Sequence, residues 1–133
     1  MPIELEMALR LLLAAALGAA IGYQRERAQK PAGLRTHILI AAGAALFTIV
    51  STYGFGVEAD PSRIAAGVVA GIGFIGAGAI IRREGGIVEG LTTAATIWAV
   101  AAIGLAAGAG MYIISVVTTA VMAIVLWLPH PIR

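Results

Sequence analysis

Five apolar stretches separated by short polar links occupy almost the whole chain between Leu5 and Leu128. Each stretch is close to the roughly 20 residues that an α-helix needs to cross the hydrocarbon core of a bilayer. The last two are separated at residues 108–110 (Gly-Ala-Gly), because one continuous helix there would be far longer than the membrane is thick. The pattern predicts an all-α membrane protein, a single bundle over residues 1–133 with five transmembrane helices at residues 5–24, 34–55, 62–81, 91–107 and 111–128.

The composition leaves no room for a water-soluble domain. Of the 133 residues, 60% are hydrophobic and 12% are charged, whereas about a quarter of the residues of a soluble domain are charged. The formal net charge is +2, but the basic residues lie in links between helices, which argues against nucleic-acid binding. The chain has no cysteine, and this excludes disulfides and thiolate metal sites. We therefore expect the lipid bilayer to be the surroundings of the chain.

The distribution of lysine and arginine predicts the orientation in the membrane. Basic residues in short loops are retained on the cytoplasmic side. Seven of them fall on one side and two on the other, namely Arg25, Arg27, Lys30, Arg35, Arg82, Arg83 and Arg133 against Arg10 and Arg63. We expect the N-terminus outside, the C-terminus in the cytoplasm, and five crossings.

Small residues indicate where the helices pack closely. Lipid tails are as apolar as leucine, so membrane helices associate where glycine and alanine let two backbones approach. The expected packing glycines are Gly18, Gly22, Gly67, Gly71, Gly73, Gly76 and Gly78. Because the glycines of helix 62–81 fall on two opposite faces, we expect this helix in the middle of the bundle, and a homo-oligomer formed through helix 5–24 or 62–81.

The link over residues 25–37 is the densest polar segment of the chain. Its candidate functional residues are Arg25, Glu26, Arg35, Thr36 and His37. One interpretation is an orientation signal with basic side chains that reach the headgroups. The other is a docking surface for an anionic partner or a lipid headgroup. His37 is either a satisfied side chain at the membrane interface or a group that titrates near neutral pH.

The remaining polar candidates lie near helix ends, and each has an ordinary structural explanation. They are Asp60, Arg63, Glu84, Thr92, Thr93 and Thr96. Asp60 precedes a proline and suits a helix cap, and threonines near a helix start cap or bond back to carbonyls. Glu84 stands beside two arginines, where a solvated pair is the default. Glu6 and Arg10 stand four residues apart and can form an ion pair.

No Asp, Glu, Lys, Arg or His lies in the middle third of any predicted helix. A dehydrated magnesium ion requires hard oxygen ligands, so one subunit lacks a carboxylate-lined path for it. Proton relays and ion-coupled pumps place ionisable groups at the same depth. The serines have no histidine and acid at a suitable depth, and the chain has no phosphate-binding loop. We expect no enzyme activity, no cofactor and no resident metal.

Three strings of residues together carry a resemblance to a known family. They are KPAGLRTH at 30–37 followed by GAALF at 43–47, SRIAA at 62–66 leading into GIGFIGAG at 71–78, and GLTTAATIW at 90–98. In this order they cover most of the chain, which resembles the N-terminal membrane domain of the MgtC/SapB family. Members linked to virulence carry a soluble C-terminal domain, and this chain is expected to comprise the transmembrane domain alone.

The resemblance implies a bacterial inner-membrane protein associated with adaptation to low magnesium. Glu84 matches an acidic position of the family, whereas Thr92 and Ala99 stand where the virulence-type members have Asn and Cys. We expect a regulatory or interaction role in magnesium limitation or envelope homeostasis, with a membrane-protein partner at the cytoplasmic face. The alternatives are a small oligomeric cation transporter or channel lined by glycine carbonyls and threonine hydroxyls, and a bare structural scaffold.

Overall fold

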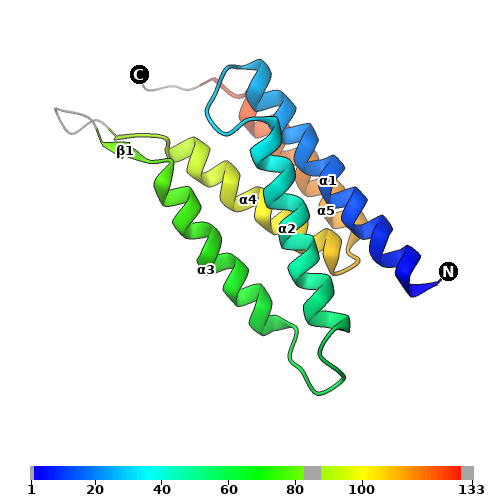
Figure 1. Cartoon of the computed structure of the whole chain (residues 1–133). Helices are drawn as coiled ribbons and strands as arrows, with labels where there is room; N and C mark the ends of the chain where they lie inside the picture. The colour runs from blue at the N-terminus through cyan, green and yellow to red at the C-terminus, as the bar shows by residue number, and fades with distance from the viewer. Residues whose placement is uncertain (1, 83–87, 130–133) are drawn as a thin grey trace.

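Five α-helices joined by short connections form an up-and-down bundle in the computed structural model of the chain (Figure 1). The structure describes residues 2–82 and 88–129. The helices are α1 (Ile3–Arg27), α2 (Leu34–Tyr53), α3 (Ser62–Gly78), α4 (Leu91–Gly108) and α5 (Tyr112–Trp127). Between α3 and α4, strand β1 (Ile81–Arg82) pairs antiparallel with β2 (Val88–Glu89). The predicted all-α class and the five helices in their order are confirmed.

The helix boundaries differ from the predicted ones by a few residues. α1 continues to Arg27 instead of ending at Gln24, and α3 ends at Gly78 instead of Ile81. The extra turn of α1 consists of arginine and glutamate, which are good helix formers although they are polar. The predicted end of this helix is where the hydrophobic pattern meets the first charged residue, whereas the observed helix continues through the charged residues to Arg27.

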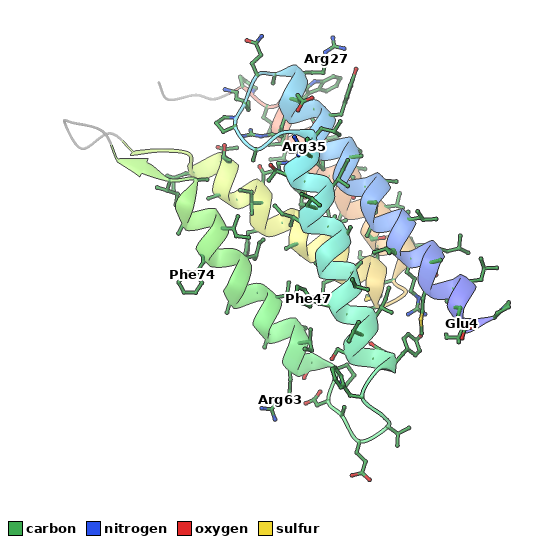
Figure 2. All side chains as sticks on the ribbon, in the orientation of Figure 1. Glu4, Arg27, Arg35, Phe47, Arg63 and Phe74 are labelled. Atoms are coloured by element: carbon green, nitrogen blue, oxygen red, sulfur yellow. The ribbon has the colours of Figure 1, made fainter. Side chains whose placement is uncertain are left out.

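The lengths and surfaces of the helices fit a membrane. α1, α2 and α4, with 25, 20 and 18 residues, are long and apolar enough to span it, while α3 and α5 are apolar helices of 17 and 16 residues. The outer faces carry large exposed apolar side chains such as Leu39, Ile113 and Phe74, and Figure 2 shows Phe74 pointing away from α3. A water-soluble monomer rarely exposes so much apolar surface, so these faces are suited to lipid.

The central helix of the bundle is α4, which packs against each of the other four helices. The prediction that helix 62–81 lies in the middle is wrong, because α3 lies at the edge and packs chiefly on α4 (Figure 1). Within the described part of the chain, Gly76 is the one glycine of α3 that faces a neighbour closely, at Ala94. A methyl group added at the other four would meet no described atom within 4 Å, at Gly67, Gly71, Gly73 and Gly78.

Helix α2 is held between two glycine faces, one on α1 and one on α4. A methyl group added at Gly18 of α1 would lie 2.5 Å from the carbonyl oxygen of His37. One added at Gly108 of α4 would lie 2.6 Å from the carbonyl oxygen of Ala45. The core between these helices consists mainly of small residues, with Ala14, Ala41, Ala45 and Ala107 fully or almost fully buried. This close backbone packing fixes the start of α2, where His37 lies.

Candidate functional site

Polar side chains gather at one end of the bundle, where α1 ends and α2 and α4 begin. We call it the basic end and define it by Arg25, Arg27, Lys30 and Arg35. Figure 2 shows Arg27 and Arg35 at this end and Arg63 at the opposite end. The structure therefore separates the candidates of residues 25–37 and 92–96 from Asp60 and Arg63 by the length of the bundle.

Arg25 is the buried member of the basic end, with 5% of its surface exposed. Its Nη2 donates a hydrogen bond to the Pro31 carbonyl oxygen at 3.3 Å and another to Oγ1 of Thr93 at the start of α4. The expectation that Arg25 belongs to an exposed docking surface is wrong for its side chain, because burial places the guanidinium between α1, the link and α4. Arg25 thus connects α1, the link and α4 through hydrogen bonds.

His37 is fully buried in the first turn of α2. Its Nδ1 lies 2.9 Å from the Gly33 carbonyl oxygen, an acceptor, so Nδ1 carries the hydrogen of this bond. Nε2 of His37 and Nε of Arg25 are buried atoms without a hydrogen-bond partner among the described residues. His37 is buried because Gly18 lets α1 approach the backbone at His37, and this contact covers the first turn of α2. Its position at the depth of the membrane interface stays a prediction.

Glu26 shapes the link between α1 and α2. Its Oε1 accepts a hydrogen bond from the Leu34 N–H at 3.2 Å, and this N–H is among the amides that a helix start leaves without an internal partner. Two residues of the link that are not glycine, Gln29 and Ala32, have φ of 56° and 58°, in the left-handed region. The link thus has a defined conformation, on which Arg35 and Thr36 are exposed.

The threonines of α4 have different surroundings. Thr92 is exposed, Thr93 is buried and accepts the hydrogen bond from Arg25, and Thr96 is buried with Oγ1 donating to the Thr92 carbonyl oxygen at 2.7 Å. Buried Thr48, Ser115 and Thr119 likewise donate to carbonyl oxygens three or four residues earlier. These hydroxyls are satisfied within their own helices, as expected for side chains that only stabilise helices in an apolar setting.

The opposite end carries two separate polar clusters. Oδ1 of Asp60 accepts hydrogen bonds from the Ser62 hydroxyl at 2.8 Å and the Ser62 N–H at 3.0 Å, which caps the start of α3. These hydrogen bonds hold the pKa of the Asp60 carboxyl below its ordinary value. Glu6 and Arg10 form the expected ion pair at 3.0 Å, and Tyr112 also donates to Glu6. Glu84 lies outside the described residues.

No three His, Asp or Glu side chains of the described residues lie close enough together to hold a metal ion. The four side chains that define the basic end, Arg25, Arg27, Lys30 and Arg35, are instead hydrogen-bond donors. Such an arrangement can bind anionic groups and has no built cage for a cation.

An up-and-down bundle of apolar helices, with four basic side chains gathered at one end, defines the class, a polytopic helical membrane protein. Within this class the chain belongs to the MgtC family, whose model matches residues 11–133. The resemblance found in the sequence is thereby confirmed. No solved structure matches the chain.

Several curated relatives support the family. The chain is 52% identical over 132 residues to the "Putative magnesium transporter YhiD" of Escherichia coli K12, covering 94% of this chain and 61% of that protein. It is 44% identical to Protein SapB of Bacillus subtilis, over 83% of this chain and 50% of the relative. It is 50% identical to Protein MgtC of Brucella abortus, over 71% of this chain and 39% of the relative. The chain thus spans less than two thirds of the length of these relatives.

Two features of the basic end and the core were not predicted from the sequence. The first is the contact of Gly104 and Gly108 of α4 with Ala41 and Ala45 of α2. Their four-residue spacing is the recognised signal of a close helix contact and could have indicated it. At the other side of α1, Nε2 of Gln24 donates to the Ala123 carbonyl oxygen of α5 at 3.0 Å. Nothing in the spacing of two residues so far apart in the chain indicates this second contact.

Proposed function

We propose that this chain is a regulatory or interaction protein of the bacterial inner membrane, without enzyme activity, which serves magnesium limitation or envelope homeostasis. The link between α1 and α2 is the part that meets a membrane-protein partner at the cytoplasmic face. The observation that carries the proposal is the separation of polar groups. Exposed, chemically varied side chains stand on the link, whereas the buried hydroxyls of Thr48, Thr96 and Thr119 donate to carbonyl oxygens of their own helices.

The geometry of the link supports a docking role. Glu26 and the left-handed residues Gln29 and Ala32 give the link a fixed shape, and a partner loses less entropy on binding a fixed surface than a variable one. Arg27 and Arg35 are exposed on this surface, one at the end of α1 and the other at the start of α2 (Figure 2). Charged side chains at the rim of an interface chiefly steer association and select partners.

Affinity capture from cross-linked membranes tests the docking role. Arg27→Ala combined with Arg35→Ala should remove specific partners from the captured set and abolish support of growth at limiting magnesium. Arg25 stays unchanged in this variant, because its buried hydrogen bonds hold the fold. Arg63→Ala is the matched control, an exposed arginine at the opposite end. A partner set that is the same in all three proteins would contradict the proposal.

The second candidate is a small cation transporter, and the name of the Escherichia coli relative favours it. An oligomer would then line the path with the glycine carbonyls of α3 and the hydroxyls of Thr92 and Thr96. Flux of magnesium or potassium into liposomes from the purified protein, abolished by Thr96→Val, would decide for the transporter. The burial of Thr96 argues for the first candidate, since a hydroxyl that lines an ion path must be accessible to the ion.

Self-association is also part of the proposal, and α3 is the helix that would form it. The Gly18 and Gly22 face of α1 is occupied by α2, whereas a methyl group at Gly67 or Gly71 of α3 would meet no atom of the described residues within 4 Å. A second copy packed there would bring two backbones together at small residues. Gly67→Leu should lower the fraction of cross-linked dimer in native membranes, while Ala16→Leu, at an exposed position of α1, serves as the control. An unchanged dimer fraction would exclude α3 from the contact.

A further inference from the structure

A groove runs between the ends of α1 and α5 at the basic end. It encloses about 680 Å³, within the range of small-molecule sites in proteins. Its lining includes Tyr23, Arg25, Arg27 and Lys30 on one side and Ile124 and Trp127 of α5 on the other. Figure 1 shows α1 and α5 running side by side toward this end. The hydrogen bond from Gln24 to the Ala123 carbonyl oxygen joins the two helices within the groove.

The charge of the groove is of one sign. Three of the described residues that line it are cationic and none is acidic. Glu26, the acidic residue nearest in sequence, is engaged with the Leu34 N–H and is absent from the lining. Positive charges in a concave site with low-dielectric walls concentrate anions, so the occupant should carry negative charge.

Arg25 gives the groove a positive charge that is fixed in place. Its Nη2 is fixed by the Pro31 carbonyl oxygen and by Thr93, and these bonds hold the guanidinium plane in place. Its Nε is buried and has no partner among the described residues. Because this nitrogen has almost no accessible surface, an occupant of the groove cannot bond to it, and Arg25 acts on the groove through its positive charge.

The walls of the groove select among anions. Ile124, Leu126 and Ala123 of α5 are apolar, and Tyr23 and Trp127 flank the groove with 55% and 84% of their surfaces exposed. Tyrosine and tryptophan are enriched at the level of the lipid headgroups. A free inorganic anion gains nothing from the apolar wall, whereas a phospholipid places its phosphate among the cations and an acyl chain along α5.

We propose that this groove is a binding site for an anionic phospholipid, with the headgroup phosphate held by Arg27 and Lys30 and one acyl chain lying along Ile124. Basic pockets between transmembrane helices are a recognised means of holding anionic headgroups. The site does not depend on the proposed protein partner, because its lining faces the space between α1 and α5.

The test uses the whole purified chain in detergent micelles with four probes, which are phosphatidylglycerol, phosphatidylcholine of the same acyl chains, inorganic phosphate and an acidic peptide. Native mass spectrometry measures lipid retention, and the melting temperature measures stabilisation. Wild type should bind phosphatidylglycerol selectively. Arg27→Gln with Lys30→Gln should weaken this binding roughly 30-fold, because each basic side chain near an anionic headgroup contributes about five-fold. The control pair Arg35→Gln with Arg63→Gln removes the same charge outside the groove.

A second variant keeps every charge and fills the groove. Ala28 lines the groove and is exposed, so Ala28→Trp should exclude the lipid while the fold is retained. Equal binding of both lipids to wild type, or unchanged binding in either groove variant, would overturn the proposal. Displacement of phosphatidylglycerol by inorganic phosphate would assign a free-anion site, and displacement by an acidic peptide would assign a protein site. None of these assays contains the partner protein, so their failure leaves the docking proposal intact.

Discussion

Arg25 is a buried cation whose described hydrogen-bond partners are neutral, a carbonyl oxygen and a threonine hydroxyl. A buried charge is costly unless hydrogen bonds compensate it, so each of these acceptors matters to stability. The pairing also spans 68 residues, from the end of α1 to the start of α4. One side chain therefore couples the conformation of the link to the central helix.

Thr93→Val should lower the free energy of unfolding by about 1–3 kcal/mol, because the buried guanidinium loses an acceptor while the shape of the side chain is kept. Thermal and denaturant unfolding in detergent micelles measure the effect. Thr92→Val is the matched control, since Thr92 is its exposed neighbour on the same helix, and a change within about 0.5 kcal/mol is expected there. Equal losses in both variants would show that the bond from Arg25 contributes nothing specific.

Asp60 gives the protein a dependence on acid pH. Because its folded-state pKa is lowered from 3.8 by the hydrogen bonds from Ser62, the carboxylate stabilises the fold above that value, and this contribution is lost as the pH falls through the lowered pKa. In Asp60→Asn the amide oxygen can still accept a hydrogen bond, but the side chain does not become protonated as the pH falls. Its melting temperature should therefore fall slightly less than that of wild type between about pH 5 and about pH 3. Parallel curves would contradict this role of Asp60.

Residue environments were predictable from the sequence only where the partner is close in the chain. The pairing of Glu6 with Arg10 and the capping by Asp60 follow from spacings of four and two residues. The polarity of the link does not distinguish the buried Arg25 and His37 from their exposed neighbours. Their burial arises from packing between α1, α2 and α4, and composition along one segment contains no information about this.

At the level of elements, the packing of α2 between α1 and α4 depends on positions where no side chain fits. A methyl group at Gly104 would overlap the Ala41 carbonyl oxygen and lie 2.9 Å from Ala41 Cα, both of which are backbone atoms that cannot rotate away. On α3, by contrast, a methyl group at Gly71 would meet nothing within 4 Å. Two glycines in membrane helices thus have opposite structural roles.

Gly104→Ala should destabilise the bundle by about 1–3 kcal/mol, because the backbones of α2 and α4 must separate to admit the methyl group. Gly71→Ala is the matched control, and it should be neutral or raise stability by about 0.5–1 kcal/mol through its higher helix propensity. Unfolding of both variants in mixed micelles measures the difference. If Gly71→Ala were the more damaging of the two, the peripheral position of α3 would be contradicted.

The number, order and approximate ends of the helices could be predicted, because each apolar run matches the thickness of a bilayer and each link is polar. The arrangement of the helices could not. Glycine spacing identifies a helix face that permits close approach. It does not tell whether another helix packs on that face. The glycines of α3 therefore predict a central position, which α4 occupies instead. The five glycines of α3 outnumber those of α4, yet only Gly76 faces another helix closely.

For the whole molecule, the basic end predicts the orientation. Since the chain has no cysteine, single cysteines report their side without background. A membrane-impermeant maleimide should label Val57→Cys, in the connection between α2 and α3, in intact spheroplasts, and Gln29→Cys only after lysis, because basic links are retained in the cytoplasm. Both positions are exposed, so differences in labelling report the side of the membrane and not burial. The reverse pattern would invert the topology, and labelling of both from outside would mean that α2 does not cross.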